Sequence, residues 1–293
     1  MLIIGSRGSQ LALWQARWVQ GRLAALGMES CIEIIKTTGD RITSVPLSSV
    51  GGKGLFTKEI EEALLARQVD LAVHSLKDLP TAIPAGLQIT AIPEREDPRD
   101  AIVGRRLAEL SEGAKVGTSS LRRSAQLRRM RPDLQVESVR GNVDTRLRKL
   151  DEGQYAAIVL AAGLNRLGLS SRISEALEPK VMCPAVGQGA LAVETRLGEN
   201  ACHALDHAAT RAAVTAERAV LSALGGGCLT PIGAHARVDG ERLRIMAIVL
   251  STDGAESVRD LAEGLASEAA LVGRELGEKL LRQGAARILS RME

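Results

Sequence analysis

A cysteine in a glycine-rich loop is the first candidate for chemistry in this sequence. Cys228 stands in GGGCLTPIG, residues 225–233, directly after a long helical pattern. The glycines before it leave the backbone free to adopt positive φ and leave the thiol without bulky neighbours in sequence. A large group could therefore approach and attach to the sulfur. The alternative is a flexible loop whose thiol is simply a small apolar residue.

An arginine-rich segment in the middle of the chain suits anionic ligands. Residues 117–149 carry eight Arg and one Lys against three acids, and the Arg fork matches a carboxylate in two places. Residues 118–120 (Thr-Ser-Ser) open a predicted helix, where hydroxyls and unpaired N–H groups make an anion site. Arg122 and Arg123 follow in the first turn, against the helix dipole, a cost that a bound anion would offset. The alternative is a solvated basic face.

A carboxylate follows another predicted strand in HSLKDLP, residues 74–80. Asp78 is the acid of that turn, and Lys77 lies beside it. In open α/β sheets the carboxyl ends of the strands face the ligand crevice. A carboxylate in a cationic cleft stays ionised and could stabilise positive charge that develops on a substrate. The alternative is a turn-forming Lys-Asp pair before proline.

Two smaller clusters complete the candidates. Arg7 and Ser9 follow the first predicted strand, and Lys53 lies in a glycine loop that lacks the spacing of a P-loop. Nucleotide binding is therefore not predicted. His203 and His207 are four residues apart on a predicted helix, but no third ligand is near, so an exposed or capping role is expected and no metal site is predicted.

Composition narrows the class of protein. A length of 293 residues predicts two or three domains. The net charge is +3, with 30 Arg against 8 Lys, so bulk charge does not indicate a binder of polyanions. Only four aromatic residues are present, Trp14, Trp18, Phe56 and Tyr155, which argues against a stacking platform for nucleic acid.

The cysteines and the N-terminal residues indicate a compartment. The four cysteines are far apart and form no CxxC pair, which argues against a zinc site and a disulfide scaffold. The first residues lack a basic leader before an apolar stretch, and no apolar run approaches the ~18 residues of a membrane span. We therefore expect a cytoplasmic protein with reduced thiols and no membrane partner.

Short apolar runs alternate with helical patterns over most of the chain, which predicts parallel sheets with helices on both faces. Proline-rich turns at 93–98 and 183–189 suggest a crossover between two such units and a return crossing. The tail predicts a small α+β domain that carries Cys228. The expected strands are 2–5, 32–35, 71–74, 87–92, 101–104, 115–117, 135–139, 156–160, 232–238, 242–250 and 257–261. The expected helices are 10–26, 57–66, one from 120, one from 143, 200–224 and 266–289.

Nine motifs in order carry a resemblance to a known family. They are SRGSQLALWQ (6–15), GGKGLFTKE (51–59), HSLKDLPT (74–81), EREDPRDA (94–101), GTSSLRR (117–123), RGNVDTRLRKL (140–150), PAVGQGAL (184–191), TAER (215–218) and GGGCLTPIG (225–233). Together they resemble the porphobilinogen deaminase, or hydroxymethylbilane synthase, family.

The resemblance implies an α/β fold with two lobes like those of type II periplasmic binding proteins and a small α+β C-terminal domain. The implied domains are residues 1–93 with 189–206, residues 94–188, and residues 207–293. The last of these would carry the cofactor cysteine. The family also suggests a monomer.

The resemblance also implies a transferase of porphyrin, haem and other tetrapyrrole biosynthesis. Such an enzyme condenses four porphobilinogens head to tail, with loss of ammonia, on a dipyrromethane primer, and releases a linear tetrapyrrole by hydrolysis. The primer would be a covalent thioether of Cys228. Six bound pyrroles would present twelve carboxylates, a reason for many Arg in one cleft.

Motif matches assign roles to the remaining residues. Asp78 would contact pyrrole N–H groups and stabilise the cation formed as ammonia leaves. Carboxylates would be held by Arg7, Ser9, Arg122, Arg123, Arg140, Arg146 and Arg166. Cofactor or substrate would be bound by Lys53, Ser75, Lys77, Thr118, Ser119, Ser120, Gln188 and Gly189.

Two other functions stay open at this stage. One is a non-catalytic, two-lobed binding protein for a dicarboxylate, which the extra cysteine-bearing domain disfavours. The other is a nucleic-acid binder that uses residues 117–149 and would show steep salt dependence. The scarcity of aromatic residues and the small net charge disfavour it.

Overall fold

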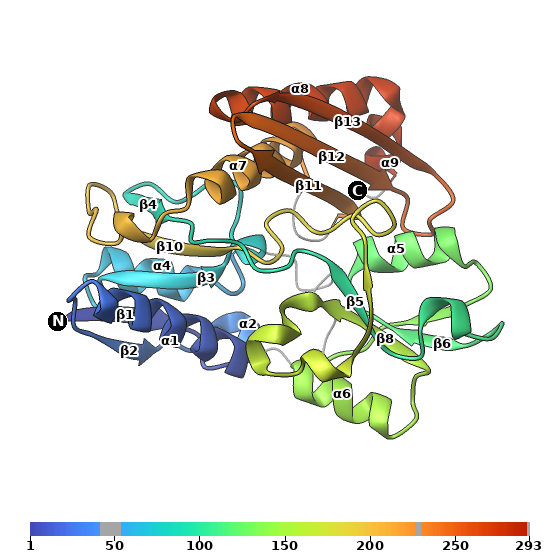
Figure 1. Cartoon of the computed structure of the whole chain (residues 1–293), viewed down its shortest axis with the longest axis horizontal. Helices are drawn as coiled ribbons and strands as arrows, with labels where there is room; N and C mark the ends of the chain where they lie inside the picture. The colour runs from blue at the N-terminus through green and yellow to red at the C-terminus, as the bar shows by residue number, and fades with distance from the viewer. Residues whose placement is uncertain (42–53, 227–229, 292–293) are drawn as a thin grey trace. The chain divides into compact units, whose positions relative to one another are not determined.

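The computed structural model describes residues 1–41, 54–226 and 230–291 of the chain (Figure 1). Two predicted site residues, Lys53 and Cys228, lie outside the described residues. The chain divides into two compact units. The first is Met1–Glu96 with Ala190–Arg211, and the second is Asp97–Gly189 with Ala212–Glu293. The second unit thus contains both the predicted second lobe and most of the predicted C-terminal domain.

The first unit is built on one mixed sheet in the order β2-β1-β3-β10-β4. β1 runs parallel to β2 and β3, and β10 lies antiparallel between β3 and β4. The strands are β1 (Leu2–Ser6), β2 (Ser30–Ile34), β3 (Leu71–Ser75), β4 (Leu87–Ala91) and β10 (Leu191–Arg196). The helical segments are α1 (Gln10–Ala25), α2 (Thr38–Arg41), α4 (Lys58–Leu65), η1 (Leu76–Asp78) and η5 (His203–Leu205).

Helices α1 and α4 cover opposite faces of this sheet. Successive side chains of a strand point to opposite faces. Leu71 and Val73 join the apolar core beneath α1, whereas Ala72 packs with Ile60 and Leu64 of α4. The alternation therefore fixes which strand residues meet which helix.

The second unit begins with a sheet of the same arrangement, in the order β7-β6-β8-β5-β9. β6 is parallel to β7 and β8, and β5 is antiparallel to β8 and β9. The strands are β5 (Asp100–Gly104), β6 (Lys115–Gly117), β7 (Gln135–Glu137), β8 (Ala157–Ala161) and β9 (Ile173–Leu177). The helical segments are η2 (Leu107–Glu109), α5 (Leu121–Met130), α6 (Val143–Asp151), η3 (Ala162–Leu167) and η4 (Ser170–Arg172).

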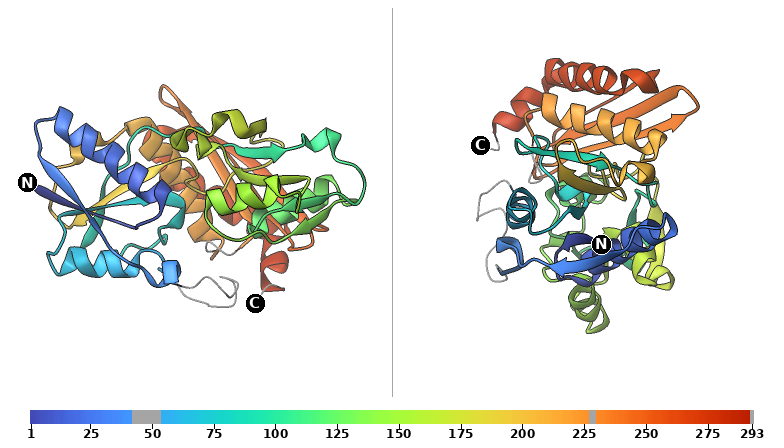
Figure 2. Two further views of the ribbon diagram at one scale, coloured as in Figure 1. Left: turned by 90° about the horizontal axis from the view of Figure 1, so that it is seen from below. Right: turned by 90° about the vertical axis from the view of Figure 1, so that its left-hand side faces the viewer.

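The C-terminal part of the second unit is an antiparallel sheet, β11-β12-β13, with helices packed against it. Helix α8 lies beside α7, so close that a Cβ on Gly273 would come within 2.1 Å of the Ala216 carbonyl oxygen (Figure 2). The strands are β11 (Ile232–Asp239), β12 (Arg242–Leu250) and β13 (Ser257–Leu265). The helical segments are α7 (Ala208–Ala223), η6 (Ala266–Glu268), α8 (Ala269–Leu280), the π-helical segment η7 (Leu281–Ala285) and α9 (Ala286–Ser290).

The α5 helix ties this C-terminal part to the preceding sheet. Arg128 donates to the Thr252 carbonyl oxygen at 2.9 Å, in the β12–β13 hairpin. Gly254 of the same hairpin has a φ of +78°, and a Cβ there would lie 2.4 Å from the Ala125 carbonyl oxygen. Only glycine permits both that backbone conformation and that approach.

The expected α/β fold class with a small α+β C-terminal part is confirmed, but the expectation of parallel sheets was wrong in part. One antiparallel strand is inserted in each mixed sheet, β10 in the first and β5 in the second. Strands β9 and β10 were not predicted, because polar residues such as Glu175 and Glu194 interrupt their apolar pattern.

Two helix predictions also need correction. The helix expected over 200–224 begins at Ala208, because His207 caps it: its Nδ1 lies 3.4 Å from the Thr210 backbone nitrogen. The single closing helix expected over 266–289 is interrupted at Gly284, whose φ of 112° is not helical.

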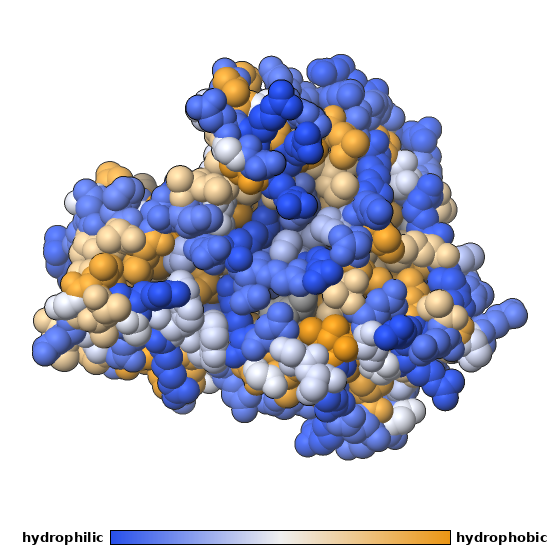
Figure 3. Space-filling model, viewed as in Figure 1, coloured by the Kyte–Doolittle hydropathy of each residue, from blue (hydrophilic) through white to orange (hydrophobic). Residues whose placement is uncertain are grey.

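The surface is mostly polar on the face that Figure 3 shows. Over the C-terminal part, hydrophilic side chains dominate that face and apolar residues form small scattered areas (Figure 3). Among the described residues, no helix is long and apolar enough to cross a membrane.

Two glycine-to-alanine changes should have opposite effects on stability. Alanine in a helix is favoured over glycine by roughly 0.5–1 kcal/mol. Gly21→Ala on α1 meets nothing within 4 Å and should raise the free energy of unfolding by that amount. Gly273→Ala meets the Ala216 backbone and should lower it by about 1–3 kcal/mol through overpacking. Urea titrations of both variants check this, and equal effects would contradict the close packing of α7 and α8.

Candidate functional site

The first unit brings two predicted site segments to one edge of its sheet. β1 and β3 are parallel neighbours, so the residues that follow them, near Arg7 and Ser75, emerge at the same edge. Ser9 is the N-cap of α1, and its Oγ accepts a hydrogen bond from the Ala12 N–H at 3.3 Å. The structure therefore gives Ser9 a capping role besides its predicted role in binding.

Arg7 is bound by residues that the sequence analysis did not single out. Its guanidinium pairs with Asp40 at 2.5 Å and stacks over the Phe56 ring at 4.1 Å from the centroid. Burial opposes ionisation of Asp40, but hydrogen bonds from Arg7 and Thr37 outweigh it and lower the pKa of the carboxyl. Arg7 is thus held in one place by an acid and an aromatic face.

The turn after β3 carries Ser75, Lys77 and Asp78. Gln15, a buried residue of α1, donates from Nε2 to Ser75 Oγ at 2.8 Å. Lys77 and Asp78 are half-buried on η1. The Asp78 carboxylate has no hydrogen bond or ion pair within the part of the chain that the structure describes, so its oxygens are available to a ligand.

In the second unit, the Thr118–Ser120 segment follows β6 and begins α5, as predicted. The Thr118 N–H donates to the Glu137 carbonyl oxygen at 2.9 Å, and Ser119 Oγ donates to the Val139 carbonyl oxygen. Ser120 is the N-cap of α5, and its Oγ accepts from the Arg123 N–H at 3.4 Å. Three hydroxyl side chains therefore lie at a helix N-terminus, where the dipole favours anions.

Arg122 and Arg123 are more buried than a surface anion site requires. They are 4% and 6% exposed, and both bind the fully buried Asp100, at 2.6 and 2.8 Å. Burial acts to raise the pKa of Asp100, but attraction to these two cations lowers it to about 2. Arg122 and Arg123, which were predicted to bind ligand carboxylates, thus already bind the carboxylate of Asp100 within the protein.

Gln188 joins this network from the returning chain. Its Nε2 donates to Asp100 Oδ1 at 2.9 Å and to the Pro98 carbonyl oxygen at 2.7 Å. Its Oε1 accepts from Arg123 at 3.4 Å. The predicted role of Gln188 in binding is therefore accompanied by a structural one, which is to orient the carboxylate and the arginines.

Arginines outnumber acids in residues 117–149. Burial, and then repulsion by the charges of Arg123 and Arg140, lower the pKa of Arg146 to about 10. Its Nε donates to the Gly141 carbonyl oxygen at 2.8 Å, a neutral partner. Because Asp100 already serves two guanidiniums, the cluster keeps an excess of positive charge, which an anionic ligand would relieve.

Arg166 and Gly189 are brought together by the structure. The Arg166 guanidinium donates to the Gly189 carbonyl oxygen at 2.7 Å. Gly189 has a φ of +87°, the left-handed region that favours glycine. Arg166 and Gly189 both belong to the second unit.

The described cysteines differ in their surroundings. Cys183 and Cys202 are buried, and burial raises the pKa of their thiols to about 12 and about 11. Thiols in such surroundings are poor nucleophiles. Cys31 is half-buried. Cys228 lies outside the described residues, so its predicted attachment role stays a prediction.

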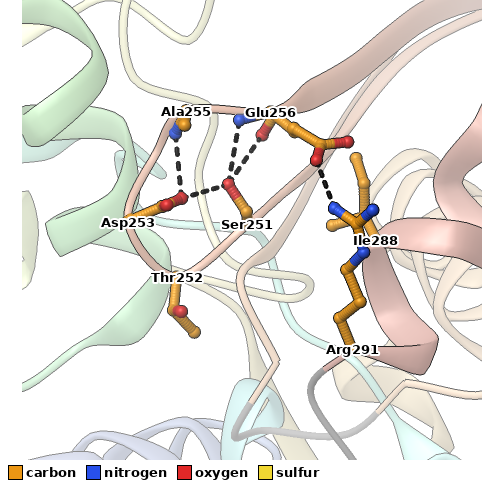
Figure 4. Close-up of a pocket in the computed structure, with 7 residues that line it drawn as sticks. All are labelled: Ser251, Thr252, Asp253, Ala255, Glu256, Ile288 and Arg291. Atoms are coloured by element: carbon orange, nitrogen blue, oxygen red, sulfur yellow. Dashed lines mark hydrogen bonds and ion pairs between the residues drawn. The ribbon is translucent and has the colours of Figure 1, made fainter.

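Cavities of about 190 and 290 Å³ occur elsewhere in the described residues, and neither is lined by a predicted site residue. No group of His, Cys, Asp and Glu that could hold a metal occurs in residues 1–41, 54–226 and 230–291. A cavity of about 190 Å³ lies between the β12–β13 hairpin and α9 (Figure 4). There Glu256 forms ion pairs with Arg287 and Arg291, so the carboxylate of Glu256 already has partners within the protein.

Family models and curated relatives that match this chain carry the name porphobilinogen deaminase. Residues 2–204 match the family model "Porphobilinogen deaminase, dipyromethane cofactor binding domain", and residues 211–282 match "Porphobilinogen deaminase, C-terminal domain". The chain is 51% identical to the porphobilinogen deaminase of Geobacter metallireducens, over 99% of this chain and 94% of that protein. It is 51% identical to that of Pelobacter propionicus, over 98% and 96%.

Solved structures resemble the fold more distantly. One is the second substrate binding domain of a putative amino acid ABC transporter from Streptococcus pneumoniae, with a TM-score of 0.44 and 13% identity over 77% of this chain and 95% of that chain. Another is the methionine binding protein MetQ, with a TM-score of 0.41 and 14% identity over 70% and 89%.

Removing the buried carboxylate should unfold the second unit more easily. Asp100→Asn leaves Arg122 and Arg123 without their counter-ion and should cost about 3–5 kcal/mol at pH 7. The pKa of Asp100 is lowered to about 2 in the folded protein. Its stabilisation is therefore full above the ordinary value of 3.8 and disappears as pH falls through about 2.

Denaturant titrations from pH 7 to pH 2.5 check both the cost and its decline. Asp133→Asn is the matched control, because Asp133 pairs with Arg131 at a similar distance of 2.7 Å but on the exposed surface. Its effect should be far smaller. Equal costs for the two variants would contradict the special position of Asp100.

Proposed function

The chain belongs to the porphobilinogen deaminase family, enzymes of tetrapyrrole biosynthesis with a dipyrromethane cofactor, and we propose how its own residues carry out that activity. In the proposed reaction, four porphobilinogens are joined head to tail. Each addition breaks the C–N bond of a substrate aminomethyl group, releases ammonia and forms a carbon–carbon bond to a pyrrole α-carbon, which loses its proton. Hydrolysis then releases the linear product.

The observation that carries this proposal is the surplus of arginine in residues 117–149, which contain eight Arg and one Lys against three acids. Porphobilinogen bears an acetate and a propionate, so every added unit brings two negative charges. Arg140, Arg146 and Arg166 are half-buried, and the pKa of Arg146 is lowered by burial and by its cationic neighbours. Bound carboxylates would remove that repulsion, and each charge-assisted hydrogen bond could contribute roughly 1.5–3 kcal/mol.

The residues of the second unit would suit a cofactor with four carboxylates, two on each pyrrole of a dipyrromethane. When bound, dipyrromethane supplies the pyrrole α-carbon to which substrate is joined. Thr118, Ser119 and Ser120 would hold its carboxylates at the start of α5, where backbone N–H groups and the helix dipole favour anions. Arg122, Arg123, Gln188 and Gly189 would complete this binding surface.

The first unit would act on the substrate. Arg7 and Ser9 would bind a substrate carboxylate, with Arg7 already oriented by Asp40 and Phe56. Ser75 and Lys77 would position the substrate, and Lys53 would assist from its glycine loop. Asp78 would accept hydrogen bonds from pyrrole N–H groups and stabilise the positive charge that develops as ammonia leaves.

The attachment point would be Cys228. Of the other cysteines, Cys183 and Cys202 are buried with raised thiol pKa values, which supports Cys228 as the reactive one. We also propose that the protein is a cytoplasmic monomer. Its domains would be residues 1–93 with 189–206, 94–188 and 207–293.

An intact mass measurement tests the attachment. The purified, denatured wild type should exceed its sequence mass by two porphobilinogens minus two ammonias, and Cys228→Ser should not. Cys31→Ser is the matched control and should keep the extra mass. A bare wild-type mass that stays unchanged after incubation with porphobilinogen would overturn the proposed function.

A second variant tests the carboxylate. Asp78→Asn keeps the shape of the side chain but removes the charge that would stabilise the substrate cation, so kcat should fall by at least about 100-fold. Circular dichroism and cofactor mass should match the wild type. Asp144→Asn, an exposed acid of α6, should keep full activity. Wild-type turnover in Asp78→Asn would remove the proposed role.

A further inference from the structure

A buried cluster of ionisable groups lies behind the turn that carries Asp78. Its members are Glu61 on α4, His74 on β3 and Glu194 on β10. His74 Nε2 lies 3.1 Å from Glu194 Oε2, and these side chains are 3% and 0% exposed. Glu61 is 7% exposed. The reaction proposed above uses none of these three side chains.

Strand alternation places the cluster on the α4 side of the sheet. Ala72 packs against α4, and His74 follows it by two residues, so both side chains share that face. In the antiparallel ladder Glu194 is opposite Ala72, and Ala192 is opposite His74. Glu194 and His74 are therefore diagonal neighbours across the two strands, which is within reach of long side chains.

The cluster is costly to bury, and one of its two glutamates contacts the imidazole. Burial, followed by the influence of Glu194, raises the pKa of Glu61 above its ordinary value, which favours the neutral acid. Glu194 is the glutamate whose Oε2 faces the His74 ring. Among the described residues, one oxygen of each glutamate, Oε1, has no hydrogen-bond partner. Replacing such a set with apolar residues is often neutral or stabilising, so stability alone does not account for it.

The position of His74 connects this cluster to the turn. His74 is followed directly by Ser75, Leu76, Lys77 and Asp78. On the α1 side, Gln15 binds Ser75. A backbone hydrogen bond from the Leu76 N–H to the Ala190 carbonyl oxygen, at 3.0 Å, also holds the turn. On the α4 side, the residue next to the turn is held by Glu194. The end of β3 is therefore fixed from both faces of the sheet.

We propose that Glu194, acting through His74, is a positioning residue for the turn that carries Ser75, Lys77 and Asp78. The pair fixes the last part of β3 and so the place of the Asp78 carboxylate. A displacement of about 1 Å at a reacting group can cost 100-fold in rate. The inference rests on the proposed function, because the role of the turn belongs to it.

The test compares three variants of β10 as purified holoenzymes. Glu194→Met has similar length but leaves the His74 ring without its hydrogen-bonding partner. Glu194→Gln keeps an oxygen in that place. Val193→Ala is the matched control: it is the preceding residue, buried on the opposite face in the α1 core, and it weakens packing without touching His74. Cofactor content, melting temperature, kcat and KM for porphobilinogen are measured for each.

Glu194→Met should lower kcat by about 10- to 100-fold, as loss of a supporting partner does in other sites, with KM within about threefold and normal cofactor content. Glu194→Gln should recover kcat to within about fivefold of wild type. Val193→Ala should keep the wild-type kcat, even if its melting temperature falls as much as that of Glu194→Met. A split of this kind is not expected from loss of stability alone.

Several results would overturn the inference. They are an unchanged kcat in Glu194→Met, a kcat in Glu194→Gln as low as in Glu194→Met, or equal losses in Glu194→Met and Val193→Ala. If Glu194→Met does not fold, His74→Met tests the same coupling, and an unchanged kcat there is decisive against it. A wild type that does not consume porphobilinogen would overturn the proposed function and this inference with it, whereas an active wild type with unaffected variants overturns only the positioning role.

Discussion

The buried attraction of Asp100 for Arg122 and Arg123 is the interaction on which the second unit depends. It ties the start of β5 to the start of α5, and Gln188 adds the returning chain. Charges as deeply buried as these persist only when they are paired. Because one carboxylate serves two guanidiniums, the pairing leaves a positive excess near Arg146. The same interaction that holds three distant segments together thus sets the sign of the ligand that the surface favours.

The first unit solves the opposite problem. There the cation Arg7 is paired with Asp40, while the turn after β3 is held by Gln15, by a backbone hydrogen bond to Ala190 and, through His74, by Glu194. None of these contacts uses the half-buried Asp78 carboxylate. An anion-binding surface and an anionic side chain are the two complements that a zwitterionic substrate with carboxylates and an amine requires.

Local patterns predicted most elements, and non-local contacts account for what was missed. The segment 117–123 correctly predicted a helix that begins at Ser120, and the structure adds that Ser120 is the N-cap of α5. Strand β10 was missed because Glu194 interrupts its apolar run, and the reason for a buried acid there lies 120 residues away in His74. Asp100 stands in a recognised motif, yet its partners are 22 and 23 residues distant. The motifs supplied the candidate site residues, but not the contacts with internal acids that hold Arg7, Arg122 and Arg123.

The place of β10 has a consequence for synthesis of the chain. β4 pairs with β10 alone among the described strands, and β10 separates it from β3. A chain emerging from the ribosome cannot complete the first sheet until residues 191–196 have appeared, well after the strands β5–β9 of the second sheet. The first sheet to begin is therefore completed only after all the strands of the second sheet have been made. Until then an unpaired edge of β3 is exposed, so this period is when the nascent chain is most open to chaperones or to aggregation.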